Sequence, residues 1–122
     1  MKMTNLEIYN SAKALVDTFV DNTKYLPIKV NFYLQKNKKT LIALAQDIDD
    51  ARMSVIRNYG TLDETGEQYI IPAEKIADAS RELDDLLTLE QDVEIYKIDI
   101  NSFPEDMMLS MEQMEALMFM ID

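Results

Sequence analysis

The chain has no cysteine, no histidine and no tryptophan. Without cysteine it forms no disulfide, no zinc–thiolate site and no iron–sulfur cluster, and it has no thiol nucleophile. Without histidine it lacks the side chain that most often acts as an acid or base near neutral pH and most often binds transition metals. We therefore expect a binding protein rather than an enzyme, with no cofactor and no metal site.

Glycine and proline are also scarce, with two and three residues among 122. This scarcity excludes collagen-like and loop-dominated proteins. The first residues lack the apolar core of a signal peptide, and no segment approaches the roughly 20 apolar residues of a membrane-spanning helix. The length suits a single domain over residues 1–122, and residence in the cytoplasm is the default expectation.

Charge is distributed unevenly along the chain. The total is 12 basic and 23 acidic residues, a net charge of −11. Residues 1–60 hold nine basic and six acidic residues, a net charge of +3, whereas residues 61–122 hold three and seventeen, a net charge of −14. The total disfavours direct binding of nucleic acid, whose phosphates are attracted by positive charge. The asymmetry indicates either an interaction surface or two halves that fold onto each other.

Two helices are predicted in the first 60 residues. The spacing of Thr4 and Glu7 is that of a capping box and predicts a helix from residue 5. Its expected apolar stripe is Tyr9, Ala12, Val16, Phe19 and Val20, with Leu15 beside it. Pro27 suits the first turn of a second helix, which Gly60 would end as a left-handed cap.

The second helix follows a nearly heptad pattern over about 30 residues. Its seam is Val30, Leu34, Asn37, Leu41, Leu44, Ile48, Ala51, Val55 and Tyr59. At 1.5 Å per residue it would be about 45 Å long, more than a compact domain of this size needs. The helix either breaks within residues 36–40 or forms the spine of an elongated antiparallel pair, and we favour the spine.

The second half mixes short helices with β elements. Residues 61–71 predict a small hairpin, Pro72 opens a third helix, and residues 93–100 have the best strand pattern, with a phase slip at 96–97 that suggests a bulge. Ser110 repeats the capping box and starts a last helix. The expected stripe of that helix is Met111, Met114, Leu117, Met118 and Ile121. The predicted fold is α+β, mainly α: a long antiparallel helical hairpin with two shorter helices and a small β element.

Carboxylates are the remaining catalytic candidates. Asp47 and Asp50 lie three residues apart and share a helix face. Facing carboxylate pairs of this kind hold magnesium in all-α nucleotide hydrolases. Such sites have a tighter, glutamate-rich spacing and a basic residue for the substrate. A magnesium-dependent nucleotide hydrolase is therefore an alternative that the spacing disfavours.

Two charged surfaces are further candidates. The candidate acidic surface is Glu82, Asp84, Asp85, Glu90 and Asp92. It could imitate the phosphates of DNA and inhibit a protein that handles nucleic acid, or it could simply keep the protein in solution. The candidate basic patch is Lys29, Lys36, Lys38 and Lys39, near Lys24 and Tyr25. The lysines are interleaved with Phe32 and Tyr33, and positive charge beside aromatic rings is typical of proteins that bind single-stranded nucleic acid. A helix, however, would turn those rings toward the core of the protein.

Methionine is concentrated at the end of the chain, with six of the nine in the last sixteen residues. Its unbranched, polarizable side chain adapts to irregular partners and is frequent at binding surfaces. Four apolar residues fall off the predicted stripe: Met107, Met108, Phe119 and Met120. They would be exposed unless another helix or another subunit covers them. We interpret them as anchors for a protein partner or for a homo-oligomer, with burial inside the chain as the alternative.

Several stretches carry a resemblance to a known family. In chain order they are Leu26–Val30, Gln35–Asn37, Asn58–Gly60, Asp63-Glu64 with Gly66, Glu94–Ile100 and Met111–Ile121. They resemble short phage and prophage proteins of Gram-positive hosts that are catalogued only as a domain of unknown function. A departure is Leu109–Glu112, where the family pattern has a small residue and a proline.

The resemblance implies a phage context, with genes often near those for tail and lysis proteins, and it supplies no catalytic residues. The implied location is the cytoplasm of the infected bacterial host or the virion. The expectation is a non-enzymatic interaction protein that binds a phage or host protein, as an assembly accessory or a host-directed effector. In this context the alternative for the acidic surface is an inhibitor of a host nucleic-acid-handling or anti-phage defence protein.

Overall fold

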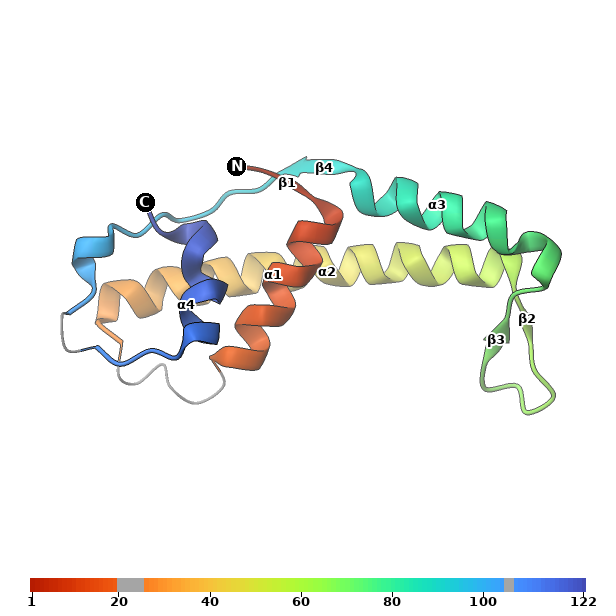
Figure 1. Ribbon diagram of the computed structural model, residues 1–122, viewed down its shortest axis with the longest axis horizontal. Coiled ribbons are helices and arrows are strands. Elements are labelled where there is room, and N and C mark those ends of the chain that lie inside the picture. The colour runs from red at the N-terminus through yellow and green to blue at the C-terminus, as the bar shows by residue number, and fades with distance from the viewer. Residues whose placement is uncertain (20–25, 105–106) are drawn as a thin grey trace.

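A single unbroken helix, α2 (Ile28–Tyr59), runs along the long axis of the molecule (Figure 1). The computed structural model describes residues 1–19, 26–104 and 107–122. With 32 residues, α2 is about 48 Å long at 1.5 Å per residue. The prediction of an unbroken spine is confirmed. None of the helices in the described ranges is long and apolar enough to cross a membrane.

Two shorter helices pack on this spine, and a third packs mainly against one of those two (Figure 1). Helix α1 (Asn5–Thr18) crosses the middle of α2, α3 (Ile76–Thr88) runs beside its carboxy-terminal half, and α4 (Met111–Leu117) lies near its amino-terminal half. Short 3-10 turns are found at Ala73–Lys75, Ile100–Ser102 and Met118–Met120. The predicted mainly-α α+β class is confirmed. The antiparallel partner of α2 is α3 and not α1, because α1 crosses α2 steeply (Figure 1).

Both predicted capping boxes are present and explain where α1 and α4 begin. The Thr4 hydroxyl accepts from the Glu7 N–H at 3.1 Å, and the Glu7 carboxylate accepts from the Thr4 N–H at 3.2 Å. The Ser110 hydroxyl and the Gln113 side chain make the same two bonds at 3.1 and 3.0 Å. Each box satisfies amide groups that the first helical turn leaves without partners.

The predicted hairpin is confirmed. Strand β2 (Thr61–Leu62) pairs with β3 (Tyr69–Ile70) in antiparallel register. In its turn the Asp63 carboxylate accepts from the N–H and the hydroxyl of Thr65, and the hydroxyl bond lowers the pKa of Asp63 below its ordinary value. Gly66 has a φ of 72°, which glycine adopts without steric cost.

The prediction of a strand over residues 93–100 is wrong. A three-residue strand, β4 (Glu90–Asp92), lies just before it and pairs antiparallel with β1 (Lys2–Thr4). The 93–100 segment itself makes one isolated bridge, between Ile98 and Ile121. At the predicted phase slip the amide of Asn37, from α2, bonds to both backbone groups of Tyr96. A helix side chain therefore takes the place that a neighbouring strand would have.

The core is one apolar cluster between α2 and the elements that cover it. Its members include Met3, Ile8, Leu15, Phe19, Val30, Leu34, Leu41, Ile48, Val93, Ile98, Leu117 and Met120. The buried seam of α2 agrees with the predicted heptad pattern, including the polar Asn37. The stripe predicted for α1 is partly wrong, because Ile8 and Leu15 are buried whereas Tyr9 and Val16 are exposed. Val20, the last predicted member, lies outside the described residues.

Gly60 ends α2 as predicted, but not in the left-handed conformation. Its φ is −100° and its N–H donates to the Ile56 carbonyl at 2.8 Å. A Cβ at this position would lie 2.8 Å from the Ile56 carbonyl oxygen and 3.3 Å from that of Ile70. A side chain here is opposed first by the Ile56 carbonyl of α2 itself and less strongly by β3, and these backbone atoms cannot move aside as a flexible side chain could.

Replacing Gly60 with alanine is expected to lower the free energy of unfolding by about 1–3 kcal/mol, the usual cost of forcing an extra methyl group into packed structure. Chemical denaturation of the two proteins measures the difference. The neighbouring exposed Asn58→Ala is the matched control and should change stability by less than about 0.5 kcal/mol. Equal stability of the Gly60 variant and the native protein would show that the Ile56 carbonyl and β3 do not oppose a side chain here.

Candidate functional site

The carboxy-terminal segment exposes methionines, but not the set that the sequence predicted. Met120 is fully buried in the core, so the expectation that it is exposed is wrong. Met107 and Phe119 are only half-exposed, and of the four predicted anchors only Met108 is fully accessible.

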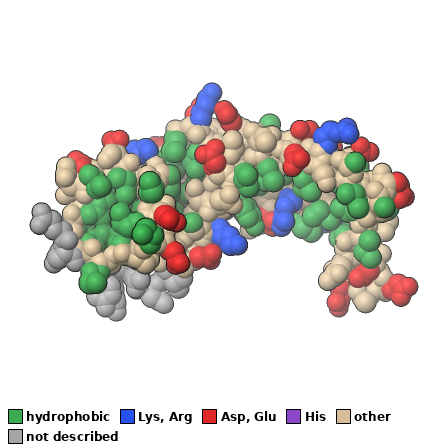
Figure 2. Space-filling model, viewed as in Figure 1, with side chains coloured by type: hydrophobic (Ala, Val, Ile, Leu, Met, Phe, Trp, Pro, Cys, Tyr) green, Lys and Arg blue, Asp and Glu red, His purple; other side chains and the backbone are tan. Residues whose placement is uncertain are grey.

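The exposed set consists of residues that were expected to form the core stripe, together with Met108. Met108, Met111, Met114 and Met118 are 94, 77, 38 and 67% exposed. We call these four residues the methionine face. In Figure 2, apolar side chains gather over α4 and the neighbouring end of the molecule. Exposed methionines on one short helix make a surface suited to binding another apolar surface.

The orientation of α4 is set by a polar contact. The side-chain amide of Gln113 is buried and donates to the carbonyl of Thr18, at the end of α1, at 2.9 Å. This bond turns Ala116 and Leu117 inward. Met111, Met114 and Met118 point outward, so the stripe predicted from hydrophobicity is wrong at these three positions. Leu117 of the same stripe is buried as predicted. A polar anchor on the buried face gives no hydrophobic signal in the sequence.

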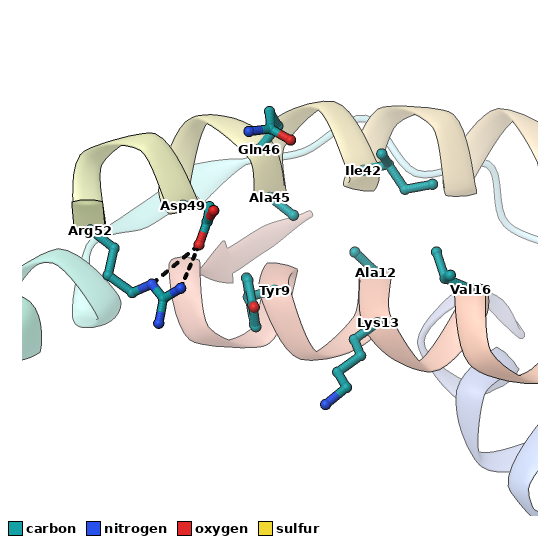
Figure 3. A pocket seen from close by; sticks show the side chains of 9 residues that line it. All are labelled: Tyr9, Ala12, Lys13, Val16, Ile42, Ala45, Gln46, Asp49 and Arg52. Carbon is teal, nitrogen blue, oxygen red and sulfur yellow. Dashed lines mark hydrogen bonds and ion pairs between the residues drawn. The ribbon is translucent and has the colours of Figure 1, made fainter. Parts of the chain in front are cut away.

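A second surface, which sequence reasoning missed, lies between α1 and α2 (Figure 3). It is a shallow, open groove of about 390 Å³. The apolar residues that line it are Tyr9, Ala12, Val16, Ile42 and Ala45. The polar residues at its rim are Lys13, Gln46, Asp49 and Arg52. We call it the α1/α2 groove.

The groove exists because α1 carries more apolar side chains than α2 covers. Ile8 and Leu15 occupy the buried line, which leaves Tyr9 and Val16 along the edge where the two helices diverge. On α2, the exposed Ile42 follows the buried Leu41. The groove could have been found from the sequence of α1. Its apolar residues cover a wider part of the helix surface than the single stripe that one packed neighbour requires.

The rim of the α1/α2 groove is mainly basic. The groove continues past Ile42 along α2 into a second hollow that Lys38 and Lys39 line. Within the rim, Asp49 pairs with Arg52 at 2.7 Å. The combined rim therefore holds the basic residues Lys13, Lys38, Lys39 and Arg52 and the acidic residue Asp49. Its formal charge is +3, against −11 for the whole chain.

No family model, curated protein or solved structure matches this chain. The surfaces are therefore interpreted from their own chemistry. The groove floor offers methyl and methylene groups and one phenol ring, and its rim offers ammonium, guanidinium and carboxylate groups. These groups can bind an apolar surface with opposite charge at its edges, and they include no activated nucleophile.

The predicted acidic surface is exposed in full. Glu82, Asp84 and Asp85 lie on α3, and Glu90 and Asp92 lie on β4. In the parts of the chain that the structure describes, ion pairs join only Arg52 to Asp49 and Arg81 to Asp78. Both pairs are local, so ion pairs between the two halves of the chain do not explain the charge asymmetry.

One acidic residue of this surface contacts α2. A side-chain hydrogen bond with Glu82, together with the negative charge of that carboxylate, raises the pKa of the Tyr59 phenol above its ordinary value. Tyr59 is the last residue of α2. The contact therefore belongs to the packing of α3 on the spine.

The predicted basic patch is divided in two. The ammonium groups of Lys29 and Lys36 lie 5.8 and 5.5 Å from the ring centroids of Tyr33 and Phe32. Phe32 is 55% exposed, so the expectation that it turns into the core is wrong. Tyr33 stacks on Tyr96 at 5.3 Å between ring centroids.

The other two lysines lie elsewhere. Lys38 donates to the Phe19 carbonyl at 3.5 Å and, with Lys39, lines the groove. Lys24 and Tyr25 lie outside the described residues. The lysine segment therefore does not form one continuous surface for a nucleic-acid strand, because its charges are shared between an aromatic cluster and the groove.

The carboxylates do not form a metal site in the described ranges. Within residues 1–19, 26–104 and 107–122, no three acidic side chains lie close enough together to hold a metal ion. Asp47 and Asp50 are both exposed, and the Asp50 carboxylate accepts a hydrogen bond from Gln46 at 3.1 Å. This arrangement gives a magnesium-dependent hydrolase no structural support.

Proposed function

We propose that this protein is a non-enzymatic interaction protein that binds another protein through its methionine face. The observation that carries the proposal is the exposure of Met108, Met111 and Met118. Leaving such side chains in water costs roughly 1.5–3 kcal/mol each relative to burying them, which a partner surface would recover. In the phage context that the sequence resemblance implies, the partner is a phage or host protein.

The chemistry of methionine suits such a contact. Its unbranched side chain with three rotatable bonds adjusts to irregular surfaces and makes favourable contacts with aromatic rings. The helix that carries the face is held rigidly by the bond from Gln113 to Thr18. A fixed backbone with adaptable side chains limits the entropy lost on binding.

The acidic surface supports the alternative, mimicry of DNA, less well than the methionine face supports binding to a protein. Mimicry of DNA requires acids arrayed on one rigid surface at roughly the spacing of phosphates. Asp84 and Asp85 are consecutive residues of α3, so they point to different sides of the helix. Binding through the acidic surface would also weaken steeply with salt, whereas an apolar contact would not.

The test removes the three most exposed side chains of the methionine face without touching the core. The triple variant Met108→Ser, Met111→Ser, Met118→Ser is compared with the native protein in affinity capture from infected and uninfected cells. The captured partner is then purified and titrated against both proteins. We expect the triple variant to bind at least tenfold more weakly, with unchanged helix content by circular dichroism.

The matched control carries Leu62→Ser, Ile70→Ser and Leu89→Ser. These three side chains are 53, 57 and 58% exposed but lie on β2, β3 and the residue after α3. It should bind the partner as the native protein does. Equal binding by the native protein and the methionine variant would refute the proposal. Binding lost only when Glu82, Asp84 and Asp85 are reversed in charge would favour the acidic alternative.

A further inference from the structure

We infer that the α1/α2 groove receives the methionine face of a second copy of this chain, giving a closed dimer with two equal contacts. The inference rests on the proposed function, because it uses the same face and names a partner for it. The groove and the methionine face are both apolar at the centre and charged at the edge. Three features of the two surfaces fit each other.

The lengths fit. The groove and its continuation are lined on α2 from Gln35 to Arg52. Seventeen residue steps of 1.5 Å make this lining about 25 Å long. Residues 111–120, which hold α4 and its final 3-10 turn, span about 15–20 Å at 1.5–2.0 Å per residue. The whole helical segment can therefore lie within the groove.

The side chains fit. Ala12 and Ala45 lie on the two walls of the groove, between the larger Val16, Ile42 and Tyr9 (Figure 3). Small side chains leave space into which a longer, flexible side chain can insert. Methionine fills irregular apolar space of this kind well, and its sulfur makes favourable contacts with the edge of an aromatic ring such as Tyr9.

The charges fit. The rim of the groove and the adjoining hollow together have a formal charge of +3, of which Lys38 and Lys39 in that hollow contribute two charges. Residues 107–122 contain Glu112, Glu115 and Asp122 and no basic residue, a formal charge of −3. Glu112 and Glu115 are exposed beside the methionine face. Opposite charge at the edge of an apolar contact favours this pairing and opposes the pairing of two methionine faces with each other.

A two-fold arrangement satisfies both surfaces at once. Each chain has one groove and one methionine face, so two chains related by a two-fold axis bury both pairs. A head-to-tail contact that did not close would leave a groove exposed at one end of a growing filament and a methionine face exposed at the other. We therefore expect a dimer of twice the 14.1 kDa chain mass.

The test measures the oligomeric state of the full chain by analytical ultracentrifugation from 5 to about 200 μM at low salt. Two charge variants are then prepared. The groove variant carries Lys13→Glu and Lys39→Glu, and the helix variant carries Glu112→Lys and Glu115→Lys. Each variant alone places like charges on both halves of the contact, so its dimer should dissociate at least tenfold more readily than that of the native chain.

Mixing the two variants restores both contacts. The acidic groove of one then meets the basic helix of the other, and the unaltered groove meets the unaltered helix. We expect the equimolar mixture to dimerise, with an affinity within about tenfold of the native chain. Because both variants must be folded to form this mixed dimer, its appearance excludes misfolding as the cause of the individual losses.

Three results would overturn the inference: a native chain that stays monomeric at 200 μM, single variants that dimerise as the native chain does, or a mixture that stays monomeric. Reversing Glu82→Lys and Glu90→Lys, away from both surfaces, is the control and should leave the dimer unchanged. The two proposals can fail separately. If the native chain is monomeric but the methionine-to-serine variant no longer captures the partner, the dimer is contradicted and the proposed function stands.

Discussion

Replacing Asn37 with leucine is expected to lower the free energy of unfolding by about 3–4 kcal/mol, one of the two largest effects in the chain. The Asn37 side chain is fully buried in the amino-terminal third of the spine helix. Its amide nitrogen donates to the Tyr96 carbonyl at 2.9 Å, and its oxygen accepts from the Tyr96 N–H at 2.8 Å. Each lost bond costs about 1 kcal/mol, and partly buried groups left unpaired add about 1–3 kcal/mol more.

The measurement is chemical denaturation, together with hydrogen exchange at the Tyr96 amide. That amide should exchange faster in the variant by a larger factor than amides of α3. Gln35→Leu is the matched control, because Gln35 lies on the same helix but is exposed and bonds only to Asn31 in the structure. If Asn37→Leu lowered the free energy of unfolding by less than about 1 kcal/mol, water would replace both hydrogen bonds at little cost.

Replacing Leu41 with alanine is expected to lower the free energy of unfolding by about 3–5 kcal/mol. Replacing the next residue, Ile42, with alanine should lower it by less than about 1 kcal/mol. Leu41 is fully buried in the core cluster with Ile8 and Leu15. Truncation there leaves a cavity that the rigid helices cannot close. Ile42 is 41% exposed and lines the α1/α2 groove, so its truncation removes little buried surface.

Thermal and chemical denaturation of the two single variants give this comparison directly. If Ile42→Ala destabilised the isolated chain as much as Leu41→Ala, the groove would be part of the core and unavailable to a partner. If Ile42→Ala left the stability unchanged but weakened the dimer, the groove would act as the contact that we infer. The pair of substitutions therefore separates folding from binding at adjacent positions.

Local features could be predicted from the sequence because their interactions span only a few residues. The two capping boxes join residues three apart, and the hairpin turn is held by Asp63 and Thr65 two residues apart. An unbroken α2 could be predicted because the heptad pattern of apolar residues continues on both sides of the lysine-rich residues 36–40. Each of these elements was predicted with the correct type and within a few residues of its bounds.

The candidate surfaces could not be predicted in the same way. Apolar periodicity shows that a helix has a buried face, but it does not show which of two apolar stripes a neighbour covers. On α1 the covered stripe contains Ile8 and Leu15, and the uncovered residues Tyr9 and Val16 line a groove. On α4 the apolar residues surround most of the helix, so the pattern gave no unique orientation.

By itself, the sequence determined the absence of thiol and imidazole chemistry, the uneven charge and the positions of the helices, because composition and local bonds depend only on residues that are near in the chain. Only the tertiary structure decided which methionines are exposed. The hydrogen bond from Gln113 to Thr18, 95 residues apart, and the burial of Leu117 in the core hold α4 with Met111 and Met118 toward solvent. Contacts between distant residues carry no local pattern, and they determine the two surfaces through which we propose that this protein binds.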